Sequence, residues 1–124
     1  MDMIVTAEEM RRAEKEYFAH GADSREVMYR AGAAMADYIA GIMDSSPGQT
    51  SFLAVCGSGN NAGDGFVAAQ ILASRGYDSH VAFIGDQDNL TPDAKYYMDK
   101  CSHLLSPVFE ADIILDAIFG TTPP

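Results

Sequence analysis

Residues 57–66 read Gly57-Ser58-Gly59-Asn60-Asn61-Ala62-Gly63-Asp64-Gly65-Phe66. Before this run, residues 52–56 form an unbroken apolar segment, which is typical of a strand covered on both faces. After it, apolar side chains of residues 66–75 fall on one helical stripe, and the stripe stops at Gly76, a favourable residue just past a helix end. The pattern predicts a strand, a glycine-rich turn and a helix.

The residue types in this turn suit a binding site. Glycine lets the backbone adopt positive φ and lets a ligand approach the main chain closely. Asn60, Asn61 and Asp64 bring amide and carboxylate oxygens to the free N–H groups of a helix start. We therefore expect an open, polar turn at the place where α/β domains bind small molecules.

Two other interpretations of the turn stay open. Gly57, Gly59 and Ala62 fit the dinucleotide fingerprint G-x-G-x-x-[GA], but an acidic residue is expected about 20 positions further on, and Asp86 is more distant. Asp64 would also occupy the helix-dipole site that a pyrophosphate prefers. Alternatively, the turn is merely tight, and Asp64 is an ordinary helix cap.

The rest of the chain predicts alternating helices and strands. Before the glycine-rich turn, we expect a helix over residues 7–19 that begins with the capping box Thr6-Ala7-Glu8-Glu9, and then a longer helix capped by Asp23 or Ser24. After the turn and its helix, we expect a strand over 80–84, a helix from Thr91-Pro92 to about Cys101, and a strand over 112–119. This alternation predicts an α/β fold: a three-layer, Rossmann-like parallel sheet with two N-terminal helices.

Asp116 is the second candidate site residue. It emerges from the last predicted strand inside an apolar run, where a carboxylate is costly to bury without partners. It either caps a neighbouring loop or has a function, and function is favoured, because ligands bind at the carboxyl ends of parallel strands.

Composition limits the remaining possibilities. The 124 residues, 48% of them hydrophobic, suit one domain over residues 1–124. A net charge of −10 argues against nucleic acid and anionic membranes as partners. The sequence contains neither a long apolar span nor a signal-peptide pattern, so a cytoplasmic location is expected.

Several residue types have structural interpretations. Cys56 and Cys101 lack metal or redox spacing and are expected to be buried free thiols. Methionines at helical spacing are expected in the core. The isolated histidines are expected to face solvent: His20, His80 and His103.

Residues 57–65, with the Asn-Asn pair and the Gly-Asp-Gly ending, closely resemble the signature of the YjeF N-terminal domain family, the NAD(P)HX epimerases. Further matches occur in family order: Glu8-Glu9-Met10, Met28-Tyr29-Arg30-Ala31-Gly32 and Leu115-Asp116-Ala117-Ile118-Phe119-Gly120. Ala62 stands where members often carry glycine.

The resemblance implies a reaction and a set of site residues. The family interconverts the R and S forms of hydrated NADH or NADPH, and a dehydratase then restores the S form. The implied ligands of a potassium ion are Asn61 and Asp116. The implied substrate contacts are Asn60, Asn61, Ala62, Gly63, Asp64, Gly120 and Thr121. Residues 120–124 depart from the usual Gly-Thr-Gly start of this loop.

The catalytic residue is unknown within this sequence. The family's acid/base aspartate belongs to an Asp-x-Pro-Ser-Gly-like stretch that would lie beyond Pro124, so the chain is expected to be the N-terminal portion of a longer domain. Asp64 is a poor substitute base, because a helix N-terminus lowers a carboxyl pKa. A sheet ending at its third strand is expected to expose an apolar edge beside residues 113–119.

Alternative functions are also open. In one interpretation the chain is the start of an epimerase, either active or inactive by itself. In the others it is a non-catalytic nucleotide- or protein-binding module of the same fold, or the N-terminal part of a bifunctional epimerase/dehydratase. Because the family often forms dimers, a homodimer through the methionine-bearing N-terminal helices is a further expectation.

Overall fold

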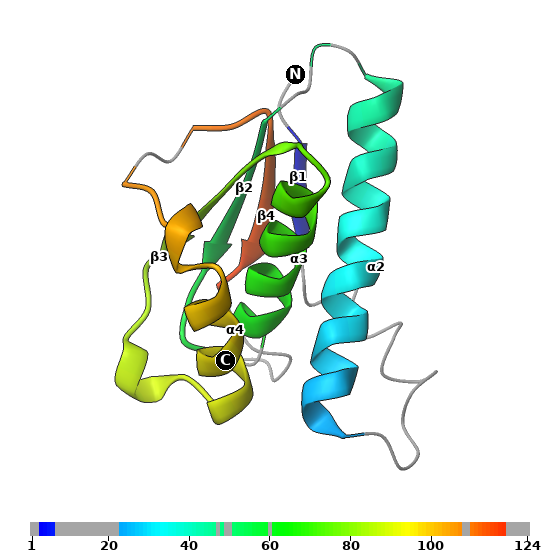
Figure 1. Cartoon of the computed structure of the whole chain (residues 1–124). Helices are drawn as coiled ribbons and strands as arrows, with labels where there is room; N and C mark the ends of the chain where they lie inside the picture. Colours follow the sequence, from blue (N-terminus) through cyan, green and yellow to red (C-terminus); the bar gives the residue numbers. More distant parts are fainter. Residues whose placement is uncertain are drawn as a thin grey trace.

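The computed structural model of the chain describes residues 3–6, 23–46, 48, 51–59, 61–107 and 110–118 (Figure 1). Within these residues, four strands form one parallel sheet in the order β1-β4-β2-β3. The strands are β1 (Met3–Thr6), β2 (Ser51–Cys56), β3 (Asp78–Phe83) and β4 (Ile113–Ala117). The predicted α/β, Rossmann-like parallel sheet is confirmed.

Strand β1 was not predicted. It pairs with β4 in register from Met3 opposite Ile113 to Thr6 opposite Asp116. The prediction of an exposed sheet edge beside residues 113–119 is therefore wrong, because β4 lies between β1 and β2. Four residues are too few to show a strand period, so only pairing with β4 identifies β1. The predicted helix over residues 7–19 lies outside the described residues.

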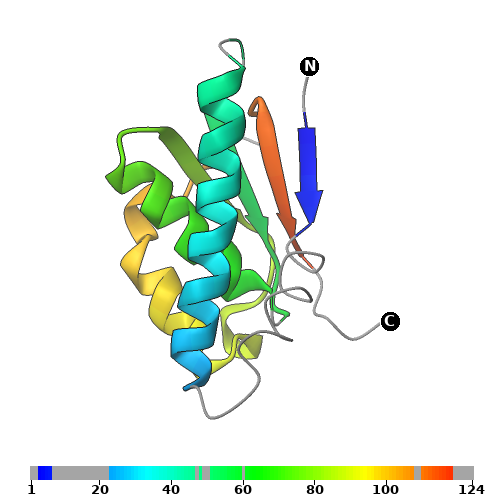
Figure 2. The ribbon, with the colours of Figure 1, turned by 90° about the vertical axis from the view of Figure 1, so that its right-hand side faces the viewer.

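The described α-helices all lie on one face of the sheet (Figure 2). They are α2 (Ser24–Ser45), α3 (Ala62–Ser74) and α4 (Pro92–Lys100), and two short 3-10 helices flank α4, namely η1 (Gln87–Asn89) and η2 (Ser102–Leu104).

Helix starts follow the predicted caps. The Asp23 side chain accepts a hydrogen bond from the Arg25 N–H at 3.1 Å, and the Thr91 hydroxyl accepts one from the Ala94 N–H at 3.2 Å. Pro92 occupies the first turn of α4, where no N–H is required. These caps satisfy otherwise unpaired donors and set where α2 and α4 begin.

The core fills the space between the helices and the sheet. Methionines of α2 contribute to it, as predicted: Met28, Met35 and Met43 are buried. Phe66 of α3 is fully buried, and its ring centroid lies 6.1 Å from that of Phe83 on β3. Tyr38, on α2, is exposed.

Helix α3 begins earlier than predicted, at Ala62 instead of Phe66. Glycine is a poor helix former, which is why the local pattern places residues 62–65 in a turn. In the structure these glycines allow close packing: a Cβ at Gly63 would collide with the Met28 side chain, and one at Gly65 would lie 2.7 Å from the Cys56 sulfur. Tertiary packing therefore overrides propensity here.

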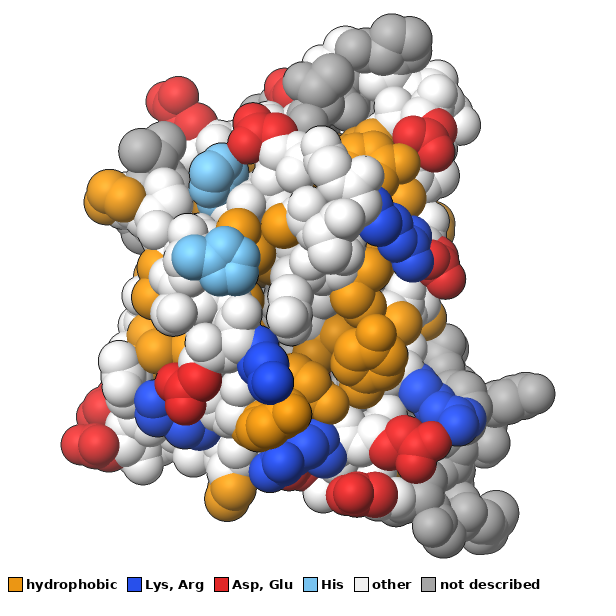
Figure 3. All heavy atoms as spheres, viewed as in Figure 1, with side chains coloured by type: hydrophobic (Ala, Val, Ile, Leu, Met, Phe, Trp, Pro, Cys, Tyr) orange, Lys and Arg blue, Asp and Glu red, His pale blue; other side chains and the backbone are white. Residues whose placement is uncertain are grey.

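A basic and aromatic surface joins α2 to α4. The Arg25 Nε forms an ion pair with the Asp93 Oδ1 at 3.1 Å. The Arg25 guanidinium lies 4.1 Å from the centre of the Tyr96 ring, and the Lys100 Nζ lies 5.1 Å from the same ring centre. Figure 3 shows Lys and Arg side chains beside exposed hydrophobic surface in the lower part of this face.

Among the described helices, none has the length and apolar character that a membrane span requires.

The predictions for the cysteines are confirmed, since Cys56 and Cys101 are buried and free. Burial raises the pKa of the Cys101 thiol to about 12. His80 and His103 are exposed, as predicted, and His20 lies outside the described residues.

Candidate functional site

The candidate site lies where the direction of strand addition changes. From β2 the chain proceeds to β3 on one side, and it returns to β4 on the other side of β2. Ligands of open parallel sheets bind outside the carboxyl ends of strands at such a switch point. Asn61 follows β2 and Asp116 lies at the end of β4, so the structure places the two predicted segments after neighbouring strands.

The loop after β2 is held in place by its neighbours. The Gly57 N–H donates to the Ala117 carbonyl at 3.1 Å. The Ser58 hydroxyl donates to the Asp86 carbonyl at 3.2 Å and accepts from the Asp86 N–H at 2.6 Å. A Cβ at Gly57 would collide with the Ile118 carbonyl oxygen, so only glycine fits this approach. The loops after β2, β3 and β4 thus form one connected edge.

The start of α3 is buried, and the prediction of an open turn is wrong. Asn61 occupies the N-cap position and is 1% exposed, while Asp64 in the first helical turn is 0% exposed. Helix α2 causes this burial, because Met28 lies against Gly63, and Gly32 lies beside the Asp64 carbonyl and Val67. Asp64 is also not the helix cap, since that position belongs to Asn61.

Asp116 is partly buried on β4. Its Oδ1 accepts a hydrogen bond from the Ile118 N–H at 3.1 Å. One oxygen of the Asp116 carboxylate thus caps the loop after β4, which is the structural alternative given above. A carboxylate has further acceptor sites, so this bond leaves Asp116 able to act as an oxygen ligand.

Thr6 lies beside Asp116, a neighbour that the sequence did not indicate. It was interpreted as the start of a capping box, whereas it ends β1 opposite Asp116. Its Oγ1 is buried and has no hydrogen-bond partner. Most buried hydroxyls in native proteins are paired, so this atom requires an explanation. No local sequence pattern could have shown it, because the pairing joins opposite ends of the chain.

The oxygen-bearing residues at this edge fit a hard cation. Potassium, implied by the family resemblance, prefers carboxylate, carbonyl and hydroxyl oxygens over thiolate or imidazole. Asp116 and Thr6 carry oxygens of these types on adjacent strands, and Asn61 carries an amide oxygen after β2. In the described part of the chain, no three side chains of His, Cys, Asp or Glu gather as metal ligands.

Cys56 lies beneath the candidate site and has a structural role. Burial is the main cause that raises the pKa of its thiol, and nearby Cys101 and Asp64 raise it further. A thiol is nucleophilic as the thiolate, so Cys56 is kept in its unreactive form.

Asp86 does not match the acidic residue of a dinucleotide site. Its Oδ1 accepts from the Asp88 N–H at 3.0 Å and caps η1, and its backbone is bonded to Ser58. The carboxylate is thus used within its own turn. This arrangement weakens the fingerprint interpretation of Gly57, Gly59 and Ala62.

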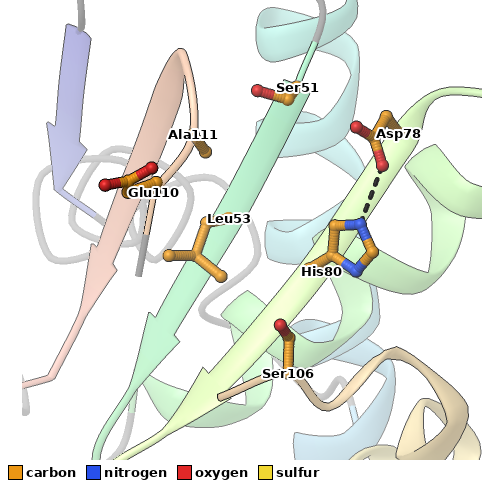
Figure 4. Close-up of a pocket in the computed structure, with 7 residues that line it drawn as sticks. All are labelled: Ser51, Leu53, Asp78, His80, Ser106, Glu110 and Ala111. Carbon is orange, nitrogen blue, oxygen red and sulfur yellow. Dashed lines mark hydrogen bonds and ion pairs between the residues drawn. The ribbon is translucent and has the colours of Figure 1, made fainter. Parts of the chain in front are cut away.

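A pocket of about 350 Å³ lies elsewhere, on the sheet face opposite to the helices (Figure 4). Ser51 and Asp78, which begin β2 and β3, are among its lining residues, so it lies at the opposite end of these strands from Asn61. Its His80 Nε2 and Asp78 Oδ1 are 2.7 Å apart, with both side chains at least half exposed. It is separate from the predicted site.

The remaining predicted substrate contacts, Asn60, Gly120 and Thr121, lie outside the described residues. Ala62 and Gly63 are described, and both are buried in the first turn of α3.

Comparisons with known proteins identify the family of this chain. The profile of a family described as "YjeF-related protein N-terminus" matches residues 24–123. An "NAD(P)H-hydrate epimerase" of Rhodobacter capsulatus is 37% identical over 97% of this chain and 63% of its own length. A "Bifunctional NAD(P)H-hydrate repair enzyme Nnr" of Methanopyrus kandleri is 33% identical over 95% of this chain and 26% of its own length. The chain therefore spans less than two thirds of these relatives.

Proposed function

The chain belongs to the YjeF-related N-terminal family, and from this premise we propose that it forms part of an enzyme that interconverts the R and S forms of hydrated NADH or NADPH. Curated relatives at 30–37% identity over most of the chain carry the name NAD(P)H-hydrate epimerase. The alternative is a non-catalytic binding module of the same fold.

One observation supports the enzyme over the binding module. Asp64 and Asn61 are buried at the switch point, while Asp116 lies near the end of the neighbouring strand β4. A scaffold has no need of a buried carboxylate, which is costly to remove from water. A small-molecule site does use a few fixed polar groups in an otherwise apolar setting.

In this proposal the edge of the sheet binds the substrate. The contacts are Asn60, Asn61, Ala62, Gly63 and Asp64, together with Gly120 and Thr121. Asn61 and Asp116 would hold the potassium ion, which would supply a fixed positive charge to orient anionic or carbonyl groups. Inversion of the hydrated centre requires a proton transfer, and no residue of this chain is assigned as the acid/base. Asp64 is unsuited to that role because it is buried in the helix start.

The proposal extends to partners and location. A relative whose name joins repair activities in one bifunctional protein supports coupling to an NAD(P)HX dehydratase. We place the protein in the cytoplasm. A homodimer would not use the α2 methionines, which face the core, so Tyr29 and Tyr38 are the better interface candidates, being 47% and 46% exposed.

Binding and turnover of R-NADHX test the proposal. We expect the chain to bind R-NADHX more tightly than NADH in calorimetry with KCl present. Asp116→Ala should weaken that binding about tenfold, since a charged ligand is lost. His80→Ala, at the far end of the strands, is the matched control and should leave binding unchanged. Equal binding of NADH and NADHX, or none, would contradict the proposal.

A coupled assay with an S-specific dehydratase then locates the acid/base. Epimerisation by residues 1–124 that Asp116→Ala abolishes would show that this chain contains a working site. Substrate binding without turnover would place the acid/base outside it.

A further inference from the structure

Thr6 and Asp116 meet across the β1–β4 ladder. They are Cα partners in a parallel pairing, and neighbouring strands lie about 4.8 Å apart. Partnered residues direct their side chains to the same face of a sheet, so the Thr6 hydroxyl and the Asp116 carboxylate lie on one face at the carboxyl end of the sheet.

The Thr6 hydroxyl has lost water without gaining a partner. Its Oγ1 is buried and makes no hydrogen bond, although Asp116 is adjacent. The Asp116 Oδ1 accepts from the Ile118 N–H instead. A hydroxyl in this state destabilises the fold unless something else uses its lone pairs.

We propose that Thr6 Oγ1 is a further ligand, beside Asp116, of the potassium ion at this edge of the sheet, an inference that rests on the potassium site of the proposed function. The neutral hydroxyl and the charged carboxylate come from adjacent strands, so their spacing is set by the ladder and not by a loop. A hard cation binds to both oxygen types. The ion would thereby join β1 to β4.

Thermal unfolding of the chain in KCl, NaCl and choline chloride at equal ionic strength tests this ligand role. A cation that binds the folded chain raises Tm in a saturable way. We expect KCl to raise the Tm of the unsubstituted chain above its value in choline chloride. In Thr6→Val, the KCl concentration for half of this shift should rise about tenfold, the usual order for a perturbed metal site.

Thr6→Val also separates ligation from an unsatisfied hydroxyl with no function. Valine has nearly the shape of threonine without the unpaired oxygen, so both explanations expect a higher Tm in choline chloride. Only if Thr6 is a ligand of the ion should the substitution also weaken the rise of Tm with KCl. Thr6→Ser retains the hydroxyl and should retain the response, and Thr6→Ala repeats the test should valine prevent folding.

Thr91→Val is the matched control. It removes the cap of α4 and should lower Tm equally in all salts. A normal KCl response in Thr6→Val and Thr6→Ala would overturn the role of Thr6 while leaving the potassium proposal intact. Absence of a KCl-specific shift in the unsubstituted chain would overturn both.

Discussion

The two faces of the sheet differ sharply. Toward the helices, Phe52 and Leu115 are 0% exposed, and α3 packs so closely that glycine is required in it. On the opposite face Leu53 is buried, but Ile4 is 68% exposed, and Asp78 and His80 border a pocket. Parallel sheets are generally covered on both faces, yet within the described residues every α-helix lies on one.

The residues that stabilise the fold and the residues proposed to bind ligands therefore lie in different parts of the sheet. Buried apolar area and close packing concentrate on the helix face, so substitutions there should mainly change the free energy of unfolding. The candidate ligand groups lie at the carboxyl edge, at the start of α3 and at the ends of the paired strands β1 and β4. Substitutions of exposed residues on the opposite face, away from that edge, should change little.

The largest contrast is expected between Phe66 and Ile4. Phe66→Ala removes a fully buried ring and should lower the free energy of unfolding by about 3–5 kcal/mol. Ile4→Ala, on the other face, should cost less than about 1 kcal/mol. Urea denaturation of both variants measures the difference. Similar costs would show that something covers the second face as tightly as the helices cover the first.

Glycines within α2 provide the next contrast. Gly32→Ala would place a Cβ against Val67 and 2.9 Å from the Asp64 carbonyl, so overpacking should cost about 1–3 kcal/mol. Gly41→Ala, in the same helix with nothing within 4 Å, should stabilise by about 0.5–1 kcal/mol. The same denaturation experiment should therefore give opposite signs, and a common sign would refute close α2–α3 packing.

Alkaline pH should weaken the helix face through its buried thiols. The pKa of Cys101 is raised from 9.0 to about 12 in the folded chain. Above pH 9 the unfolded chain loses a proton that the folded chain retains, so stability is complete below pH 9 and falls as pH rises toward 12. The slope is at most about 1.4 kcal/mol per pH unit for one thiol.

Stability measured from pH 8 upward in the unsubstituted chain and in Cys101→Ala checks this dependence. The variant should lose stability less steeply above pH 9, the ordinary pKa of the thiol. Identical slopes would mean that the thiol ionises freely and is less buried than the structure shows.

The smallest contrast comes from adjacent residues of β3 that face opposite ways. Ser79→Ala removes a buried hydrogen bond of 2.8 Å to the Ala69 carbonyl and should cost about 1 kcal/mol. Asp78→Asn breaks an exposed pair with His80 and should cost less than about 0.5 kcal/mol. Thermal shifts resolve the two, and a larger cost for Asp78 would assign a structural role to the pocket.

Much of the fold could be predicted from short windows of sequence. The apolar run of residues 52–56, the caps at Asp23 and Thr91, and the burial of Cys56 and Cys101 all agree with the structure. Each depends on contacts within a few residues or on hydrophobicity alone, and local patterns report both.

The candidate site was predicted only in part, because its residues were identified without their surroundings. The Asn-Asn-Ala-Gly-Asp run and Asp116 were recognised, and the structure places them after neighbouring strands. The burial of Asn61 and Asp64 was missed, since it comes from α2, which lies well before them in the chain. Gly63 and Gly65 were likewise expected to open the turn to a ligand, whereas they allow close packing of α3.

Local sequence patterns specify the strand–helix alternation and the starts of α2 and α4, because hydrogen bonds and side-chain periods within one turn or strand define them. Tertiary structure alone decided that β1 exists, that β4 lies between β1 and β2, and that the Thr6 hydroxyl lies beside Asp116. These features depend on the pairing of β4 with β2 and with β1, which are far from β4 in the sequence, and no local pattern records such pairing.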